Sequence, residues 1–218
     1  QTNIYFTDMN TIVFDFDGTL ADTRNLIVST MQQTIAQLGL PAKTELECIK
    51  MIGLPLRQSF AQLLSVDDEQ AALCENLYKN LFVKNYKPGI VVLFPDVEDT
   101  LAEMRAMGCV LAVASSRGHD SLDILLDMLN IRRFFSYVVT SEDVPNAKPA
   151  PDMVNLILDY TEDIPENVLV VGDTAFDVNM GFSAGVKTCA VTYGNGAIGE
   201  LAHADFIIHN FKTLLDII

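Results

Sequence analysis

Residues 11–19 read Thr-Ile-Val-Phe-Asp-Phe-Asp-Gly-Thr, and this stretch decides the fold. The apolar run over 11–16 predicts a central strand that is covered on both faces by helices. The strand ends in Asp15 and Asp17, and side chains two residues apart point the same way. Two carboxylates at the tip of a buried strand are costly unless a cation compensates them. Gly18 then allows a sharp turn or a close approach to a ligand. The alternative is a solvated acidic turn.

Composition limits the classes of partner that the chain can have. The 218 residues, half of them hydrophobic, suffice for one domain or for a core with a modest insertion. A net charge of −15 without a basic stripe argues against nucleic acid. We expect no membrane partner, because no apolar run is long enough to span a bilayer and residues 1–10 lack a secretory signal. The sequence leaves open whether residues 1–8 are native, and the oligomeric state is unknown.

The cysteines and histidines show no metal-site spacing. The four cysteines are scattered without a Cys-x-x-Cys pair, and the spacing of His119, His203 and His209 is not that of a metal site. We therefore expect buried, reduced thiols in a cytoplasmic protein.

The chain divides into a helical block and an alternating part. Helical spacing is predicted over 22–38, 44–51, 55–64 and 68–85, followed by a return hinge at 87–89. Predicted strands then alternate with helices: strands at 109–114, 137–140, 168–171, 187–191 and 206–208, and helices at 96–107, 119–129, 151–160, 176–184 and 211–217. This order predicts an α/β fold, a Rossmann-like doubly wound parallel sheet formed by 1–20 and 89–218, with an all-helical insertion over 21–88.

Polar residues follow four of the predicted strands, and ligands of open α/β sheets bind at those carboxyl ends. The candidates are Asp15, Asp17, Ser115, Ser116, Lys148, Asp173 and Asp177. Acids, hydroxyls and a lysine together suit a divalent cation beside a phosphoryl group. Each residue also has an ordinary alternative: the serines and Asp173 as helix caps, and Lys148 and Asp177 as solvated surface residues.

The order of these residues resembles the four motifs of the haloacid dehalogenase-like superfamily. Those motifs are Asp-x-Asp, a Ser or Thr after an apolar strand, a Lys before Pro-x-Pro-Asp, and Gly-Asp-Thr-x-x-Asp. All four occur here in the same order, and the resemblance spans nearly the whole chain. Agreement of the complete series carries more weight than any single match.

The resemblance implies a role for each matching residue. Asp15 would be the nucleophile that forms an aspartyl-phosphate, and Asp17 the general acid and base. Mg²⁺ would be held by Asp15, by the Asp17 backbone carbonyl and by Asp173, with Asp177 orienting its waters or bonding to Lys148. The groups implied to bind the phosphoryl oxygens are Ser115, Lys148 and the backbone N–H near Ser116.

The inserted helices resemble the family's small α-helical cap. Residues 52–57, Ile-Gly-Leu-Pro-Leu-Arg, are similar to the specificity loop of phosphoglycolate phosphatase-like proteins and point to Gly53 and Arg57. Arg57 would then meet a second anionic group of the substrate, such as a carboxylate. The alternative, slightly favoured, is an exposed helix residue. Arg24 and Lys50 are weaker candidates for the same task.

Comparison within the family favours a phosphatase of a small phosphorylated metabolite, closest to phosphoglycolate phosphatase. Asp17 argues against a dehalogenase, 24–31 lacks the histidine of sugar phosphomutases, and no lysine follows Gly53 as in phosphonoacetaldehyde hydrolases. Inorganic pyrophosphatase, nucleotidase and sugar phosphatase remain alternatives. A phosphorylated signalling domain or an inactive phosphate-binding relative are alternatives of another class; the length, the helical insertion and Asp17 argue against the first, and the intact acids and lysine against the second.

Overall fold

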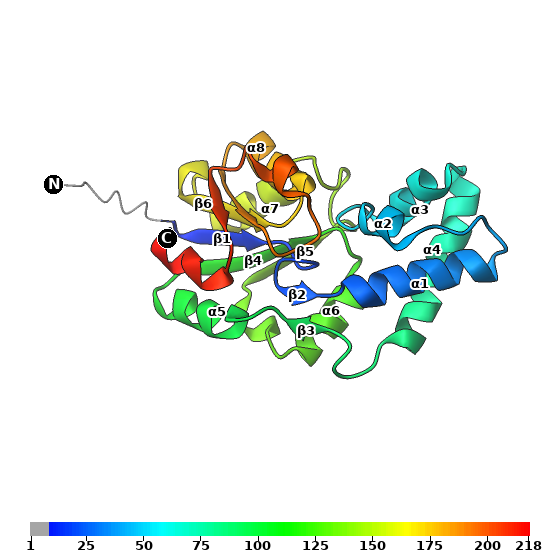
Figure 1. Cartoon of the computed structure of the whole chain (residues 1–218). Coiled ribbons are helices and arrows are strands. Elements are labelled where there is room, and N and C mark those ends of the chain that lie inside the picture. Colours follow the sequence, from blue (N-terminus) through cyan, green and yellow to red (C-terminus); the bar gives the residue numbers. More distant parts are fainter. Residues whose placement is uncertain (1–8) are drawn as a thin grey trace.

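The computed structural model describes residues 9–218 of the chain. Residues 1–8, whose origin the sequence left open, lie outside the described part. Within it, a six-stranded parallel sheet forms the centre of the molecule (Figure 1).

The strands of this sheet lie in the order β5-β4-β1-β6-β7-β8. Renumbered by their order along the chain, they read 3-2-1-4-5-6, which is the order of the doubly wound nucleotide-binding fold. This confirms the predicted fold class. The strand bounds are β1 (Thr11–Phe14), β4 (Val110–Ser115), β5 (Tyr137–Thr140), β6 (Val168–Gly172), β7 (Lys187–Val191) and β8 (Phe206–Ile208).

Helices cover both faces of the sheet, as the doubly apolar first strand predicts. Ile12 and Phe14 of β1 pack with α5 (Val97–Ala106) and α6 (His119–Met128), while Val13 packs on the opposite face with α7 (Asp152–Thr161) and α8 (Ala175–Ala184). The expected terminal helix is instead a 3₁₀ helix, η4 (Phe211–Asp216). Further short 3₁₀ turns are η1 (Arg132–Phe134), η2 (Pro165–Asn167) and η3 (Ile198–Leu201).

Four helices extend beyond the carboxyl ends of the strands, to the right in Figure 1. They are α1 (Arg24–Gln37), α2 (Glu45–Ile49), α3 (Leu56–Leu64) and α4 (Asp68–Asn85). Local sequence fixes two of their starts: Thr44 and Glu47 form a capping box at α2, and Asp67 accepts from the Gln70 backbone N–H at α4. Their buried apolar side chains join the cluster on the α5–α6 face of the sheet, so one hydrophobic core runs through both regions.

A second, two-stranded sheet connects these helices to the central sheet. β2 (Ala21–Asp22) and β3 (Val92–Leu93) pair in antiparallel fashion, with Asp22 opposite Val92. The sequence predicted helix-only structure from residue 21 and no strand here. Two residues are too few for an alternating pattern, and their pairing joins segments about seventy residues apart, which local periodicity does not record.

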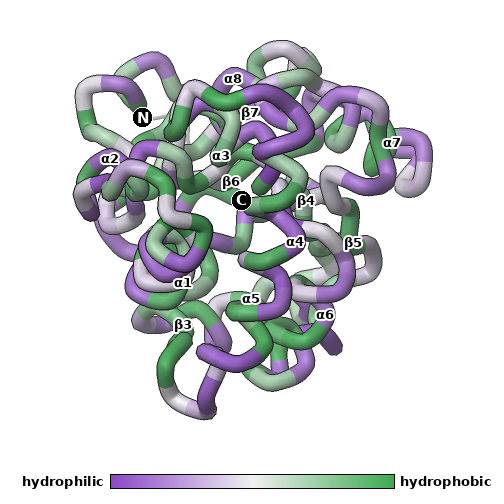
Figure 2. The backbone as a smooth tube through the Cα atoms, turned by 90° about the vertical axis from the view of Figure 1, so that its right-hand side faces the viewer, coloured by the Kyte–Doolittle hydropathy of each residue, from purple (hydrophilic) through white to green (hydrophobic). Residues whose placement is uncertain are grey.

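Polar and apolar residues alternate along helices such as α1 and α4 in Figure 2. In keeping with this pattern, none of the helices within residues 9–218 has the length and apolarity needed to cross a bilayer. The four cysteines are buried and free, as the sequence predicted.

Candidate active site

The carboxyl end of β1 places Asp15 at the centre of the sheet edge. β1 lies between β4 and β6, and the Asp15 backbone N–H donates to Val171 O at 2.9 Å. The chain then turns at Gly18, where φ is +95° and an added Cβ would collide with the Asp173 carboxylate. Glycine is therefore required here both for the backbone angle and for the close approach of two chain segments.

Lys148 is the buried cation of this edge. Its side chain is fully buried, and Nζ lies 2.6 Å from Asp15 Oδ1 and 2.6 Å from Asp177 Oδ1. Burial by itself lowers the pKa of Lys148, but the two carboxylates outweigh it and hold the pKa above its ordinary value. The lysine is thus a fixed positive charge between two acids, not a solvated surface residue.

Asp173 and Asp177 approach the same point from the end of β6 and the first turn of α8. Thr19 Oγ1 donates to Asp173 Oδ1 at 3.2 Å, and the Asn195 backbone N–H donates to Oδ2 at 2.6 Å. Asp177 accepts from Thr174 and so closes a capping box at the start of α8. Asp177 is therefore buried and contacts Lys148, so the alternative of a solvated residue is wrong, and the N-cap of α8 is Thr174 and not Asp173.

These acids carry more negative charge than the protein compensates. Four buried carboxylates, those of Asp15, Asp17, Asp173 and Asp177, face two cations, the buried Lys148 and the largely buried Arg117, so two negative charges remain when all are ionised. Burial, followed by Asp177, raises the pKa of Asp173 to about 7. Burial also raises the pKa of Asp15 well above its ordinary value, because the neighbouring acids offset much of the effect of Lys148.

This surplus fits a divalent cation. Asp15, Asp173 and Asp177 each offer a ligand atom, and these atoms lie within 4.8 Å of one another. Oxygen ligands of this kind are those that Mg²⁺ binds, and two positive charges would balance the two uncompensated negative ones.

The Asp17 carboxylate faces a different set of partners. Arg117 donates to both of its oxygens, from Nε at 2.7 Å and Nη2 at 2.8 Å, and Thr23 Oγ1 donates at 2.6 Å. Asn195 Nδ2 reaches the Asp17 backbone carbonyl at 3.3 Å. The sequence did not predict that Arg117, Thr23 and Asn195 belong to the site. Only Arg117 had a usable signal, because it directly follows Ser115 and Ser116 at the end of β4.

The two serines form contacts of their own. Ser115 is buried, and its Oγ accepts from the Arg117 backbone N–H at 3.2 Å. Ser116 Oγ donates to the Gly53 carbonyl at 2.6 Å, which connects the end of β4 to the loop before α3. The N-cap of α6 is Gly118, without a side-chain cap, so neither serine caps that helix, and Gly53 lies next to the end of β4.

Two of the three remaining basic candidates, Arg57 and Arg24, are held by other groups. Arg57 Nε donates to Glu75 at 2.8 Å, and Arg24 donates to Asn195 Oδ1 at 2.8 Å and to the Gly194 carbonyl at 2.6 Å. Lys50 is exposed at the end of α2.

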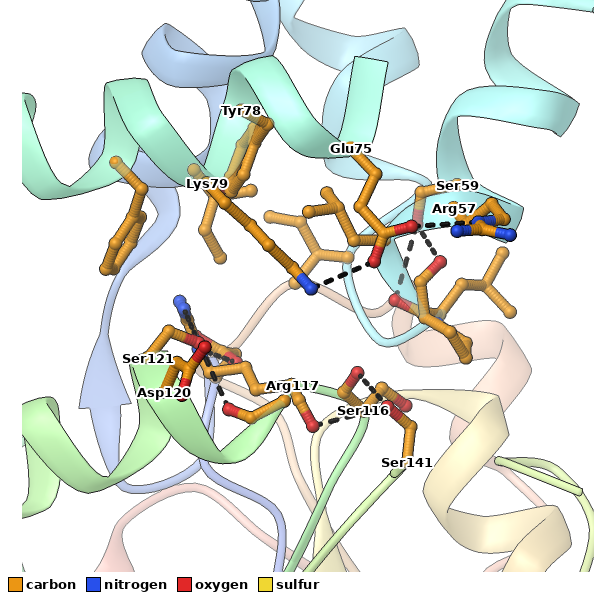
Figure 3. Close-up of a pocket in the computed structure, with 18 of the residues that line it drawn as sticks. Arg57, Ser59, Glu75, Tyr78, Lys79, Ser116, Arg117, Asp120, Ser121 and Ser141 are labelled. Atoms are coloured by element: carbon orange, nitrogen blue, oxygen red, sulfur yellow. Dashed lines mark hydrogen bonds and ion pairs between the residues drawn. The ribbon is translucent and has the colours of Figure 1, made fainter. Parts of the chain in front are cut away.

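A cavity of about 450 Å³ opens between the sheet edge and helices α1, α3 and α4. Asp15, Asp17, Ser116, Gly53 and Arg57 line it (Figure 3 shows 18 of the lining residues). The volume lies in the range of roughly 300–1,000 Å³ that is usual for small-molecule sites. Of the sequence-predicted acids, Asp15 and Asp17 therefore line a cavity that fits a metabolite, and Lys148 contacts Asp15.

Comparison with known proteins gives a consistent set of similarities. A family model described as haloacid dehalogenase-like hydrolase matches residues 12–191. Pyrophosphatase PpaX from Oceanobacillus iheyensis is 31% identical over 212 residues, which cover 96% of this chain and 97% of that protein.

Two solved structures share the fold over nearly their whole length. A haloacid dehalogenase-like family hydrolase from Streptococcus pneumoniae aligns with a TM-score of 0.83 at 27% identity, over 96% of this chain and 98% of that one. A predicted phosphoglycolate phosphatase from Haemophilus somnus aligns with a TM-score of 0.88 at 24% identity, over 97% and 99%.

Proposed function

The chain belongs to the haloacid dehalogenase-like hydrolases, and from this premise we propose that it is a magnesium-dependent phosphatase acting on a small phosphate monoester. One observation carries the proposal: Lys148 and Asp15 are in contact at 2.6 Å in a buried cluster of acids. A nucleophilic carboxylate and a fixed cation at the end of a cavity are what attack on a dianionic phosphoryl group requires.

The reaction proceeds in two steps. An Asp15 carboxylate oxygen attacks phosphorus, the bond from phosphorus to the ester oxygen breaks, and Asp17 gives its proton to the departing alkoxide. Water then attacks phosphorus, Asp17 takes up a proton from it, and the acyl-phosphate bond breaks to release inorganic phosphate and restore Asp15. Lys148 holds the Asp15 oxygen in place and offsets charge on the phosphoryl oxygens, with Ser115 and the backbone N–H near Ser116 as further donors.

Asp15, the Asp17 carbonyl and Asp173 would hold Mg²⁺, and Asp177 orients its waters or fixes Lys148. When bound, the ion supplies positive charge that lets the phosphoryl group approach the carboxylates. The charge surplus of the buried acids supports this assignment.

Removal of divalent metal is expected to abolish hydrolysis. Protein treated with EDTA and dialysed should release phosphate from 4-nitrophenyl phosphate at under about 1% of the rate with millimolar Mg²⁺, because metal charge stabilisation contributes several kcal/mol. Phosphate release is measured before and after Mg²⁺ is restored. Full activity after chelation would contradict the metal assignment. A single phosphorylation without turnover would instead support the signalling alternative.

Loss of the Arg117 side chain is expected to slow the hydrolysis of some esters more than others, depending on whether the leaving group needs a proton. Arg117 holds both oxygens of Asp17, so Arg117→Ala misplaces the proton donor. Hydrolysis of benzyl phosphate, whose alkoxide needs a proton, should fall by roughly 10²-fold, whereas 4-nitrophenyl phosphate should lose much less. The kcat values of Arg117→Ala for both substrates are compared with those of Arg133→Ala. Arg133 is a matched control because both arginines pair with an acid and lie over an aromatic ring, Phe82 for Arg117 and Phe134 for Arg133. Equal losses for both substrates would contradict a role through Asp17.

We propose that residues 21–88 act as a cap that excludes water from the first step, with 1–20 and 89–218 as the catalytic core. The three inserted helices that line the cavity, α1, α3 and α4, and the contact between Ser116 and Gly53 support this division. Four buried free thiols favour a cytoplasmic setting.

Pyrophosphate is the second candidate substrate, because a relative covering 96% of the chain is a pyrophosphatase. Its leaving group is a charged phosphate, so the cavity would have to accommodate negative charge where a monoester places an alcohol.

A further inference from the structure

The part of the cavity beyond the acids is walled mainly by apolar side chains. They come from α1, the loop before α3, α4 and α6. The residues are Ile27, Met31, Ile52, Leu54, Phe82 and Ile124. A leaving group in this space would contact hydrocarbon on several sides, so an apolar group gains most from entering it.

The two basic side chains of the helical region that line the cavity are already paired. Glu75 of α4 lies 2.8 Å from Arg57 Nε and 3.2 Å from Lys79 Nζ, and Asp68 lies 3.6 Å from Arg57. Figure 3 shows Glu75 between the two cations on the cavity side of α4. Burial raises the pKa of Glu75, but the hydrogen bonds from Arg57 and Lys79 outweigh it and lower the pKa, so Glu75 is ionised at neutral pH.

Other charged groups around the cavity add no positive charge. Arg117 is paired with Asp17, and the remaining charged lining residues of the opposite wall are the acids Asp120 and Glu142. Every cation that lines the cavity within residues 9–218 therefore has a carboxylate partner. A second anionic group on the substrate would have to displace Glu75 or remain unpaired next to acids, and unpaired buried charge is strongly unfavourable.

We infer that the substrate is a phosphate monoester of an uncharged, largely apolar alcohol, rather than a phosphorylated acid or a diphosphate. This rests on the proposed phosphatase function and names its substrate class. The cavity of about 450 Å³ admits the phosphoryl group together with an aromatic ring or a short branched chain. Glu75 sets this preference for an uncharged leaving group. Because Arg57 and Lys79 are paired with Glu75, their positive charge is already balanced and does not attract an anionic leaving group.

Three probes distinguish the substrate classes: benzyl phosphate, 2-phosphoglycolate and inorganic pyrophosphate. The first two have alkyl leaving groups of similar chemistry and differ in charge. With Mg²⁺ present, kcat/KM for benzyl phosphate should exceed that for each of the other two by at least about tenfold, a factor that contacts of one small apolar group can supply. Equal values or the reverse order would overturn the inference while leaving the phosphatase function intact. Hydrolysis of none of the three, nor of 4-nitrophenyl phosphate, would overturn the proposed function itself.

A variant of Glu75 tests the cause of the preference. Glu75→Gln frees Arg57 and Lys79, so the ratio of kcat/KM for benzyl phosphate to that for 2-phosphoglycolate should shrink about fivefold, in line with one partly exposed ion pair. Glu103→Gln removes the same charge from the exposed surface of α5 and should leave the ratio unchanged. An unchanged ratio in Glu75→Gln would show that Glu75 does not set the preference and would overturn that part of the inference.

Discussion

Replacing Asp15 with asparagine is expected to reduce phosphate release from every ester by on the order of 10⁴-fold or more, because the amide cannot form the acyl-phosphate bond. The fold should survive. Asparagine occupies nearly the same volume, Lys148 keeps its contact of 2.6 Å with Asp177, and burial already disfavours the charge of Asp15 by raising its pKa. Phosphate release is measured with Mg²⁺ at saturating substrate, and thermal unfolding is followed by circular dichroism.

Asp127→Asn is the matched control for this variant. Asp127 is exposed near the end of α6 and does not line the cavity, so its amide should retain the full rate. An Asp15→Asn protein that is folded and still releases phosphate at more than about a hundredth of the normal rate would contradict the nucleophile assignment.

Replacing Lys148 with methionine is expected to damage both stability and catalysis. The change leaves Asp15 and Asp177 buried without their shared cation, and breaking a buried ion pair in this way costs about 3–5 kcal/mol of unfolding free energy. Activity should fall by roughly 10³-fold, since a positioned charge on the phosphoryl oxygens is lost. Unfolding free energy is measured in urea, and phosphate release in parallel.

The pH dependence of this loss has a definite sign. Without Lys148 the folded-state pKa of Asp15, which burial already raises above its ordinary value, rises further, so the variant binds protons more tightly when folded. Its stability deficit should therefore be smaller near pH 5 than near pH 7.5. Lys187→Met serves as the control, because Lys187 is half-exposed in its pair with Asp205 and should change stability by less than about 0.5 kcal/mol. A Lys148→Met protein as stable and active as this control would contradict the central role of the buried lysine.

The sequence predicted the sheet and the acidic cluster because both follow from local patterns. Each apolar run ends in polar residues, and parallel strands bring those ends to one edge, so Asp15, Lys148 and Asp173 meet although they are far apart in the chain. The order of the motifs indicated the family and the chemical role expected of each residue. Their chemical roles remain proposals that the variants above test.

Side-chain pairing was the part that the sequence could not supply. Arg117 reaches Asp17 because of its rotamer and the turn after β4, and Arg57 meets Glu75 only because α3 and α4 pack side by side. Neither pairing has a periodic signature. The short strands β2 and β3 were missed for a related reason, since each is defined by a partner distant in sequence.

The pairing of Asp22 with Val92 brings the two ends of the helical segment next to each other. A segment whose ends adjoin can be lengthened, shortened or exchanged without requiring the flanking strands to separate. Recombination between related genes at these two positions would thus replace the cavity-lining side chains of the helical segment and leave the acidic strand ends unaltered. The paired strands β2 and β3 are therefore a point at which the helical segment can be exchanged. The incoming helices must keep the apolar side chains that pack in one core with the sheet.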